Sequence, residues 1–192
     1  MNYDEVTAIR ERKGIRLDVG CGEGKQPGFI GMDIRQLPGV DLVHDIEVFP
    51  WPLTNASCVL IVCSHVVEHI KPWFSIPFMN ECWRVLEEHG ELAISTPYPG
   101  SRGFWQDPTH CNGWSEATFQ YFDPSYPLYQ IYKPRPWAIR KGFPVWQANG
   151  NLEVVLVKVL EREAEEKQDV VGNTLGVCVA DKAGVKSVMG GK

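Results

Sequence analysis

Leu17-Asp18-Val19-Gly20-Cys21-Gly22-Glu23-Gly24 is the stretch on which the fold of this chain depends. The residues that lead into it, 14–19, form an aliphatic and β-branched run that is typical of a buried strand. A Gly-x-Gly-x-Gly turn follows, and glycine permits both a positive φ and a close approach of a ligand to the backbone. Ligands of open α/β sheets bind at the carboxyl ends of strands, so the turn predicts a binding site. A tight turn without a ligand is the alternative.

The spacing of the glycines indicates which of two kinds of nucleotide-binding turn is present. The dinucleotide fingerprint G-x-G-x-x-G fails, because its third glycine would fall at Lys25. The turn instead resembles motif I, (D/E)-x-G-x-G-x-G, of the class I S-adenosylmethionine-dependent methyltransferases of type 11. This resemblance implies an α/β fold, Rossmann-like and doubly wound, with a mostly parallel sheet. It also implies S-adenosyl-L-methionine as the cofactor, bound at this turn by Asp18, Gly20, Cys21, Gly22 and Gly24.

Two further short strands are expected, over residues 28–34 and 40–45, and each ends near an acid. The resemblance assigns the residues at these strand ends to the ribose and the adenine of the cofactor: Asp33, Ile34, Asp45 and Ile46. A carboxylate suits the ribose because it only accepts hydrogen bonds and can take two donors at once. An ordinary turn aspartate is the alternative for Asp33.

The connection between the first two strands is unusually short. Only residues 25–27 separate Gly24 from the second expected strand. A parallel crossover normally takes roughly a dozen or more residues and contains a helix. We therefore expect the first helix of the usual fold to be missing or reduced to a loop.

A continuous apolar run over residues 57–63 predicts a central strand, covered on both faces. The resemblance places the backbone of Ser64 and His65, which follow it, near the methionine end of the cofactor. His65-x-x-Glu68-His69 also matches the H-x-x-E-H pattern of inverted zinc peptidases. That chemistry needs a longer helix and a third ligand, and Lys71-Pro72 ends the segment early. We therefore expect no metal site here.

An amphipathic helix is expected over residues 75–86, with Ser75 as its N-cap and Gly90 as the residue that stops it. Its apolar positions recur at three and four residues, which is typical of a face packed on a core. A fifth strand is expected over residues 91–96. The methyltransferase resemblance covers residues 15–96.

Residues 97–150 form an aromatic-rich insertion, and the resemblance implies that it lies on the substrate side of the fold. Long loops of this kind tend to carry function. If the methyl acceptor must lose a proton, His110 or Asp107 is the expected base, since histidine titrates near neutral pH. The alternative is an aromatic-packed structural loop in which Asp107 caps a turn.

The apolar residues over 152–160 predict a strand, and the resemblance implies that it forms an antiparallel pair with residues 136–141. Residues 1–160 would then make up one methyltransferase domain. The charged and glycine-rich residues 161–192 are expected to form a peripheral or partly disordered tail.

The composition excludes several classes of protein. A net charge of −5 argues against a broad nucleic-acid surface. No apolar run approaches the roughly 20 residues of a membrane span, and the N-terminal residues lack an apolar signal segment. The six cysteines form no C-x-x-C pair and resemble reduced core thiols, so a cytoplasmic location is expected.

The sequence thus predicts methyl transfer from S-adenosylmethionine to an unidentified acceptor, either a small molecule or a nucleobase-like group. A non-catalytic module that binds the same cofactor is the alternative, and a zinc hydrolase comes third. The oligomeric state is left open.

Overall fold

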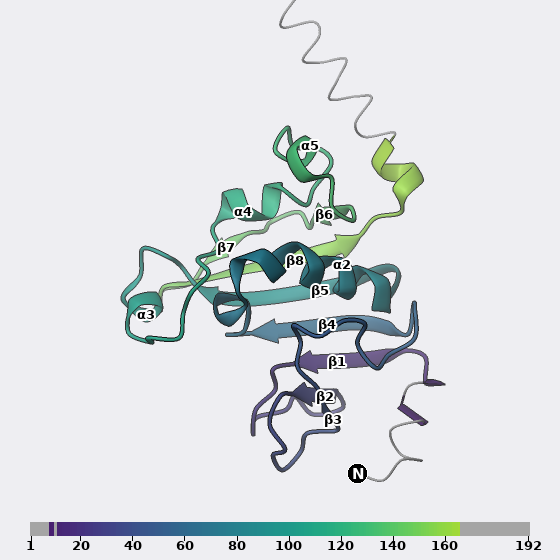
Figure 1. Cartoon of the computed structure of the whole chain (residues 1–192). Helices are drawn as coiled ribbons and strands as arrows, with labels where there is room; N and C mark the ends of the chain where they lie inside the picture. The colour runs from purple at the N-terminus through teal and green to yellow at the C-terminus, as the bar shows by residue number, and fades with distance from the viewer. Residues whose placement is uncertain (1–7, 10, 166–192) are drawn as a thin grey trace, which may run out of the picture.

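The computed structural model describes residues 8, 9 and 11–165, and its centre is one eight-stranded sheet (Figure 1). The strands run in the order β3-β2-β1-β4-β5-β8-β6, with β7 also paired to β8. Their bounds are β1 Ile15–Val19, β2 Ile30–Asp33, β3 Leu42–Val43, β4 Cys58–Ser64, β5 Leu86–Pro97, β6 Trp137–Ile139, β7 Val145–Trp146 and β8 Asn151–Lys158.

The helical elements are short, except for one. Those with both ends among the described residues are η1 Val67–His69, η2 Pro72–Phe74, α2 Ser75–Val85, α3 Arg102–Trp105, α4 Glu116–Gln120 and α5 Tyr129–Tyr132. None of the helices in the described residues is long and apolar enough to cross a membrane.

The strand directions confirm the expected fold class. The first five strands pair in parallel, from β3 at one edge to β5. β8 then runs antiparallel to β5, β6 and β7. The expected C-terminal antiparallel pair is therefore present as β6 and β8.

The crossover from β1 to β2 contains no helix, as its length predicted. Residues 20–29 form turns whose backbone is held by the strands beside them. The N–H of Gly20 donates to the carbonyl of Met32 at 2.7 Å, and the N–H of Gln26 donates to the Asp18 carboxylate at 2.8 Å. The ammonium of Lys25 pairs with Asp41 at 2.6 Å. These bonds tie the turns to β1, β2 and the residues before β3 without a crossover helix.

One face of the sheet holds the core. Figure 1 shows α2 lying across the strands, and Phe78, Met79 and Cys82 of this helix are fully buried. β8 shows how the two faces differ, because buried and half-buried residues alternate along it. Val154 on the covered face is 1% exposed, whereas Val155 on the other face is half-buried.

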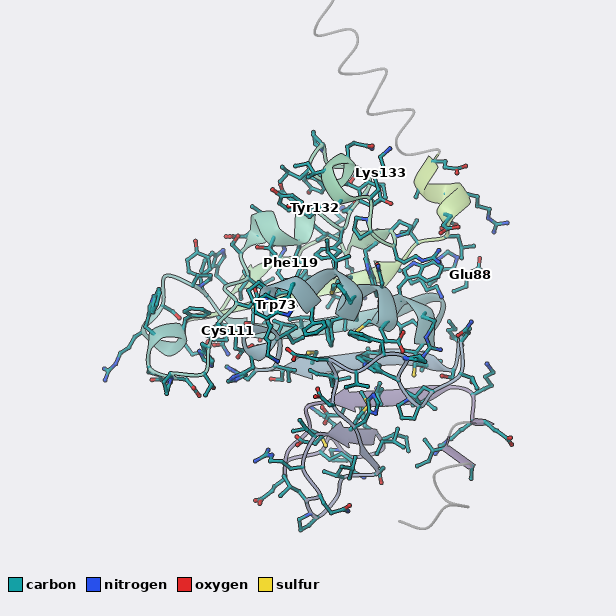
Figure 2. All side chains as sticks on the ribbon, viewed as in Figure 1. Trp73, Glu88, Cys111, Phe119, Tyr132 and Lys133 are labelled. Atoms are coloured by element: carbon teal, nitrogen blue, oxygen red, sulfur yellow. The ribbon has the colours of Figure 1, made fainter. Side chains whose placement is uncertain are left out.

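The aromatic-rich segment supplies a second part of the core. Phe119, labelled in Figure 2, is fully buried, and its ring centroid lies 5.3 Å from that of Trp114. The Trp114 indole N–H donates to the carbonyl of Val67 at 3.2 Å. The segment is therefore anchored directly on the residues that follow β4.

Two expectations about α2 are wrong. The N-cap is Phe74, and Ser75 is the first helical residue, because η2 leads directly into α2. The helix ends at Val85, and both Leu86 and Gly90 belong to β5. The register of β5 against β4 shifts between Cys58 and Leu60, so the expected glycine turn is an irregularity inside the strand.

The predicted division of the chain at residue 160 stays a prediction. Residues 161–165 form a helical turn in which Ala164 is buried. The remainder of the predicted tail, residues 166–192, lies outside the described residues.

Candidate functional site

The largest cleft near the strand ends, of about 780 Å³, opens beside the carboxyl ends of the parallel strands. This is the edge at which ligands of open α/β sheets bind. Its walls come from the glycine turn, from the ends of β2, β3 and β4, and from the following loops. The lining residues are Gly20, Asp33, Ile34, Arg35, His44, Asp45, Ile46, Glu47, His65, Val66, His69, Ile70, Lys71 and Thr109.

Six of the predicted cofactor residues line this cleft together: Gly20, Asp33, Ile34, Asp45, Ile46 and His65. The other five do not line it: Asp18, Cys21, Gly22, Gly24 and Ser64. Sequence reasoning missed several lining residues, notably Arg35, Lys71 and Thr109. They lie in loops that carry no motif, and only the tertiary structure brings them to the cleft.

Gly20 is placed where no other residue fits. Its φ is +67°, and an added Cβ would lie 2.4 Å from Cγ2 of Val66. The turn after β1 and the segment after β4 therefore pack against each other through a glycine backbone. Through this contact, the glycine turn and the segment after β4 form one continuous part of the cleft wall.

Asp33 is held in place as a carboxylate. One oxygen accepts from the backbone N–H and the side-chain Nε of Arg35, at 2.9 and 3.2 Å. The other accepts from the backbone N–H of Gly22 at 2.9 Å. Burial alone would raise the pKa of Asp33, but these hydrogen bonds and the Arg35 charge outweigh it, so the pKa is lowered. Of about four acceptor positions on a carboxylate, one is left for a ligand.

Asp18, in β1, and Cys21, in the glycine turn, do not line the cleft. Asp18 is 6% exposed, and its carboxylate accepts from the N–H of Gln26. Burial raises the pKa of Asp18, while the Gln26 hydrogen bond and the Lys25 charge oppose this shift. Burial, together with the nearby carboxylates, raises the pKa of the Cys21 thiol to about 11. The Cys21 side chain is thus a neutral thiol near pH 7.

A second hollow, of about 350 Å³, adjoins the cleft and shares His65 and His69 with it. Its remaining walls come from the aromatic-rich segment and the start of β8: Pro97, Gly103, Gln106, Asp107, His110, Asn149 and Asn151. Both predicted bases, Asp107 and His110, therefore face a space next to the cofactor cleft. Trp105, which precedes them, does not line it and is 76% exposed.

Glu68 is fully buried and lies near both His65 of the cleft and His110 of the hollow. Its backbone carbonyl accepts from the N–H groups of Cys111 and Asn112, at 2.9 and 3.1 Å. These bonds hold the loop that carries His110 against η1. The Glu68 carboxylate lies 3.3 Å from Nδ1 of His65, and it raises the pKa of that histidine.

The H-x-x-E-H pattern does not form the helix that a zinc peptidase needs. His65 has a φ of +55°, and only the three residues of η1 are helical. Ligand atoms of Glu68, His69 and His110 lie within 4.8 Å of one another, so a metal-competent group exists without His65. The third ligand beside Glu68 and His69 is His110, which lies outside the H-x-x-E-H pattern.

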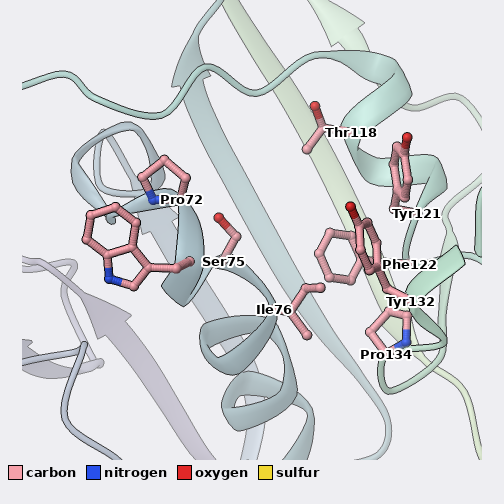
Figure 3. A pocket seen from close by; sticks show the side chains of 9 residues that line it. Pro72, Ser75, Ile76, Thr118, Tyr121, Phe122, Tyr132 and Pro134 are labelled. Atoms are coloured by element: carbon pink, nitrogen blue, oxygen red, sulfur yellow. The ribbon is translucent and has the colours of Figure 1, made fainter.

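An apolar groove on the α2 side is the other conspicuous hollow (Figure 3). Trp73 and Ile76 line one wall, and Tyr121, Phe122 and Tyr132 line the other. The residues that line it include no carboxylate and no histidine. We therefore place the functional site in the cleft and the adjoining hollow.

Comparison with known proteins gives the resemblance of this chain in sequence and in fold. This chain matches no protein-family model. A protein of Mycobacterium tuberculosis described as a probable S-adenosylmethionine-dependent methyltransferase is 34% identical to it in an alignment of 97 residues, and the match covers 42% of this chain and 35% of that protein. The chain thus matches about a third of the length of this curated relative.

Two solved structures share the fold. One is a SAM-dependent methyltransferase from Archaeoglobus fulgidus, with a TM-score of 0.56, 18% identity, and coverage of 81% of this chain and 90% of that one. The other is a Burkholderia thailandensis 1,6-didemethyltoxoflavin-N1-methyltransferase with its substrate and S-adenosylhomocysteine bound, with a TM-score of 0.54, 11% identity, and coverage of 82% and 78%. The resemblance to S-adenosylmethionine-dependent methyltransferases is thereby confirmed in sequence and in fold.

Proposed function

We propose that this chain, which has the fold of the class I methyltransferases, transfers a methyl group from S-adenosyl-L-methionine to an acceptor bound in the adjoining hollow. The observation that carries the proposal is the cleft itself. It joins a glycine turn to Asp33 and Asp45 at the ends of consecutive parallel strands. Sequence relatives described as methyltransferases support it.

The residues of the cleft fit the cofactor. Ile34, Ile46 and Val66 offer apolar surface for an adenine, and Ile34 is 63% exposed although it is aliphatic. Asp33 keeps one acceptor position for a ribose hydroxyl, since its other positions are used by the turn and by Arg35. Asp18, Cys21, Gly22, Gly24 and Ser64 contribute to the cofactor site by shaping the turn and the end of β4.

The cofactor supplies an already activated methyl group, so the chain mainly has to orient the acceptor and exclude water. The hollow that holds Asp107 and His110 is suited to this task. Nδ1 of His110 lies 2.7 Å from the carbonyl oxygen of Phe104, which can only accept, so Nδ1 carries the proton. In the neutral ring, Nε2 is then free to take a proton from the acceptor.

The acceptor is proposed to be a small molecule or a nucleobase-like group. The hollow is small, and the relative of shared fold from Burkholderia thailandensis holds a small heterocycle. The five cysteines in the described part of the chain are free thiols, which supports a cytoplasmic location.

Calorimetry with S-adenosylhomocysteine tests the cofactor, with NAD as the comparison. We expect the former to bind and Asp33→Ala to weaken it by about 1.5–3 kcal/mol, roughly ten- to hundredfold, because charged-acceptor hydrogen bonds are lost. Glu91→Ala is the matched control, since this carboxylate pairs with Arg140 outside the cleft. Binding of NAD with no binding of S-adenosylhomocysteine would refute the proposal.

A screen of acceptors with labelled cofactor separates an enzyme from a non-catalytic binding module. With an acceptor found, a folded His110→Ala, Asp107→Asn double variant should turn over more slowly while its S-adenosylhomocysteine affinity stays within about twofold. An unchanged rate in that variant would exclude both residues from catalysis.

A further inference from the structure

Glu68 carries a polar atom that the protein leaves unsatisfied. The side chain is fully buried, and its Oε2 accepts from the hydroxyl of Thr96 at 3.0 Å. Its Oε1 makes no hydrogen bond of good geometry among the described residues, and its nearest charged neighbour is Nδ1 of the half-exposed His65 at 3.3 Å. A buried carboxylate oxygen without a hydrogen bond is costly, so a stronger ligand for this atom is expected.

His110 aims a free nitrogen toward the same atom. Its Nε2 lies 3.9 Å from Glu68 Oε1 and 4.0 Å from Asp107 Oδ2. Because Nδ1 donates to the carbonyl of Phe104, Nε2 of the neutral ring carries a lone pair. The side chain is only 7% exposed, so this orientation is fixed by packing as well as by the hydrogen bond.

His69 is held in the matching tautomer by a chain of hydrogen bonds. The hydroxyl of Thr109 donates to the Asp107 carboxylate at 2.7 Å, so its only proton is used. Thr109 Oγ1 therefore accepts from Nδ1 of His69 at 3.0 Å. This leaves a lone pair on Nε2 of His69. Metal-binding histidines are usually oriented in this way, with the second ring nitrogen bonded to a hydrogen-bond acceptor.

We propose that Glu68, His69 and His110 bind one divalent first-row transition-metal cation. One ligand atom from each residue lies within 4.8 Å of the others, and together they offer an oxygen and two imidazole nitrogens. Such a set leaves coordination positions open and is typical of catalytic cation sites with nitrogen and oxygen ligands. The group lies between the cleft and the hollow, since His69 lines both.

The charges around the group favour a cation. Asp107 supplies a second carboxylate beside His110. His65 is the competing group, with its Nδ1 3.3 Å from Glu68 Oε1, and it would have to turn away, which also breaks the contact of its Nε2 with the Asn151 side chain at 3.0 Å. His65 is half exposed, and therefore has room to move toward solvent.

The cation would have a defined role toward the acceptor, and this role, unlike the binding itself, rests on the proposed methyl transfer. It would bind and orient an oxygen of the acceptor in the hollow. His110 could then not act as the base, because one lone pair cannot bind a cation and accept a proton. Asp107 would be left as the proton acceptor.

Calorimetric titration of the chelator-treated full chain with Zn²⁺, repeated with Co²⁺ and followed by visible absorption, tests the site. We expect one ion per chain, and a loss of affinity of roughly a hundredfold or more in His69→Gln and in His110→Gln. His69 is exposed, so its variant should fold, and circular dichroism checks this.

Two controls separate this site from adventitious binding. Cys111→Ser removes an exposed thiol next to His110, and His89→Gln removes an exposed histidine elsewhere; both should leave the affinity unchanged. Failure to bind either ion, or equal affinity in His69→Gln, would overturn the proposal. The S-adenosylhomocysteine titration is independent, so metal binding without cofactor binding supports this site and refutes only the proposed function.

Discussion

At the scale of one residue, Gly20 allows two segments of the cleft wall to meet. Its positive φ turns the chain after β1, and the missing side chain leaves room for Val66, which follows β4. A side chain at this position would be unfavourable for two reasons. The positive φ strains any residue with a Cβ, and the Cβ would collide with Val66. The glycine thus joins two parts of the cleft wall that are distant in sequence.

Gly20→Ala should destabilise the fold more than Gly14→Ala. The two glycines have nearly the same φ, +67° and +68°, but a Cβ at Gly14 meets nothing within 4 Å. We expect about 1–2 kcal/mol of backbone strain at each position and about 1–3 kcal/mol more from the collision at Gly20. Urea denaturation measures both values.

Val66→Ala in the Gly20→Ala background gives the decisive comparison. The substitution removes the two γ methyl groups of Val66. It should therefore recover the part of the lost folding free energy that comes from the collision, and leave the part that comes from backbone strain. Equal losses in Gly20→Ala and Gly14→Ala would show that Val66 does not press on the turn.

At the scale of an element, α2 is fastened to the far edge of the sheet by one tryptophan. The indole N–H of Trp83 lies 3.1 Å from the carbonyl of Pro136 and 3.0 Å from that of Val159. The ammonium of Lys158 lies 3.9 Å from the Trp83 ring centroid. Burial lowers the pKa of Lys158, while its ammonium also donates to the carbonyl of Leu86. Trp83 therefore connects the helix with the segments around β6 and β8.

Trp83→Phe should cost about 1–3 kcal/mol in the free energy of unfolding. The ring stays, but two carbonyls lose their shared donor and part of the cation–π attraction is lost. Trp73→Phe is the control, because Trp73 is 70% exposed, and its loss should stay within about 0.5 kcal/mol. Denaturation followed by far-UV circular dichroism gives both values, and a similar loss in the two variants would contradict this role.

At the scale of the whole molecule, the short β1–β2 crossover leaves the two faces of the sheet unequal. A helix after β1 would normally pack on one face, and here residues 20–29 contain none. α2 and the aromatic-rich segment bury the other face. The two faces of β8 differ in burial in the same way, since the buried residues Leu152, Val154 and Leu156 alternate with half-buried neighbours.

Val154→Ala and Val155→Ala should therefore differ although they change neighbouring residues of one strand. Both lose the same β propensity, but only Val154, which is 1% exposed, leaves a cavity in the core. We expect about 2 kcal/mol or more for Val154→Ala and less than about 1 kcal/mol for Val155→Ala. Chemical denaturation measures the pair, and equal losses would mean that both faces are covered in solution.

The elements that could be predicted are those set by local pattern. The strand before Gly20 and the short crossover follow from the apolar pattern, the glycine spacing and the length of the connection, whereas the antiparallel pair near the C-terminal end is implied by the resemblance. The end of α2 could not be predicted, because the apolar stripe continues from Val85 into Leu86 and suits a helix and a strand equally. Pairing of Leu86 with Cys58 in β4 decided it.

The sequence by itself determined the class of the fold and the strand ends at which a ligand would bind, because both depend on residues close together in the chain. Tertiary structure alone decided which side chains meet there. Glu68 and His110 are far apart in sequence, and no periodicity relates them. They face each other because the carbonyl of Glu68 accepts from the backbone of Cys111 and Asn112, which holds the His110 loop beside it.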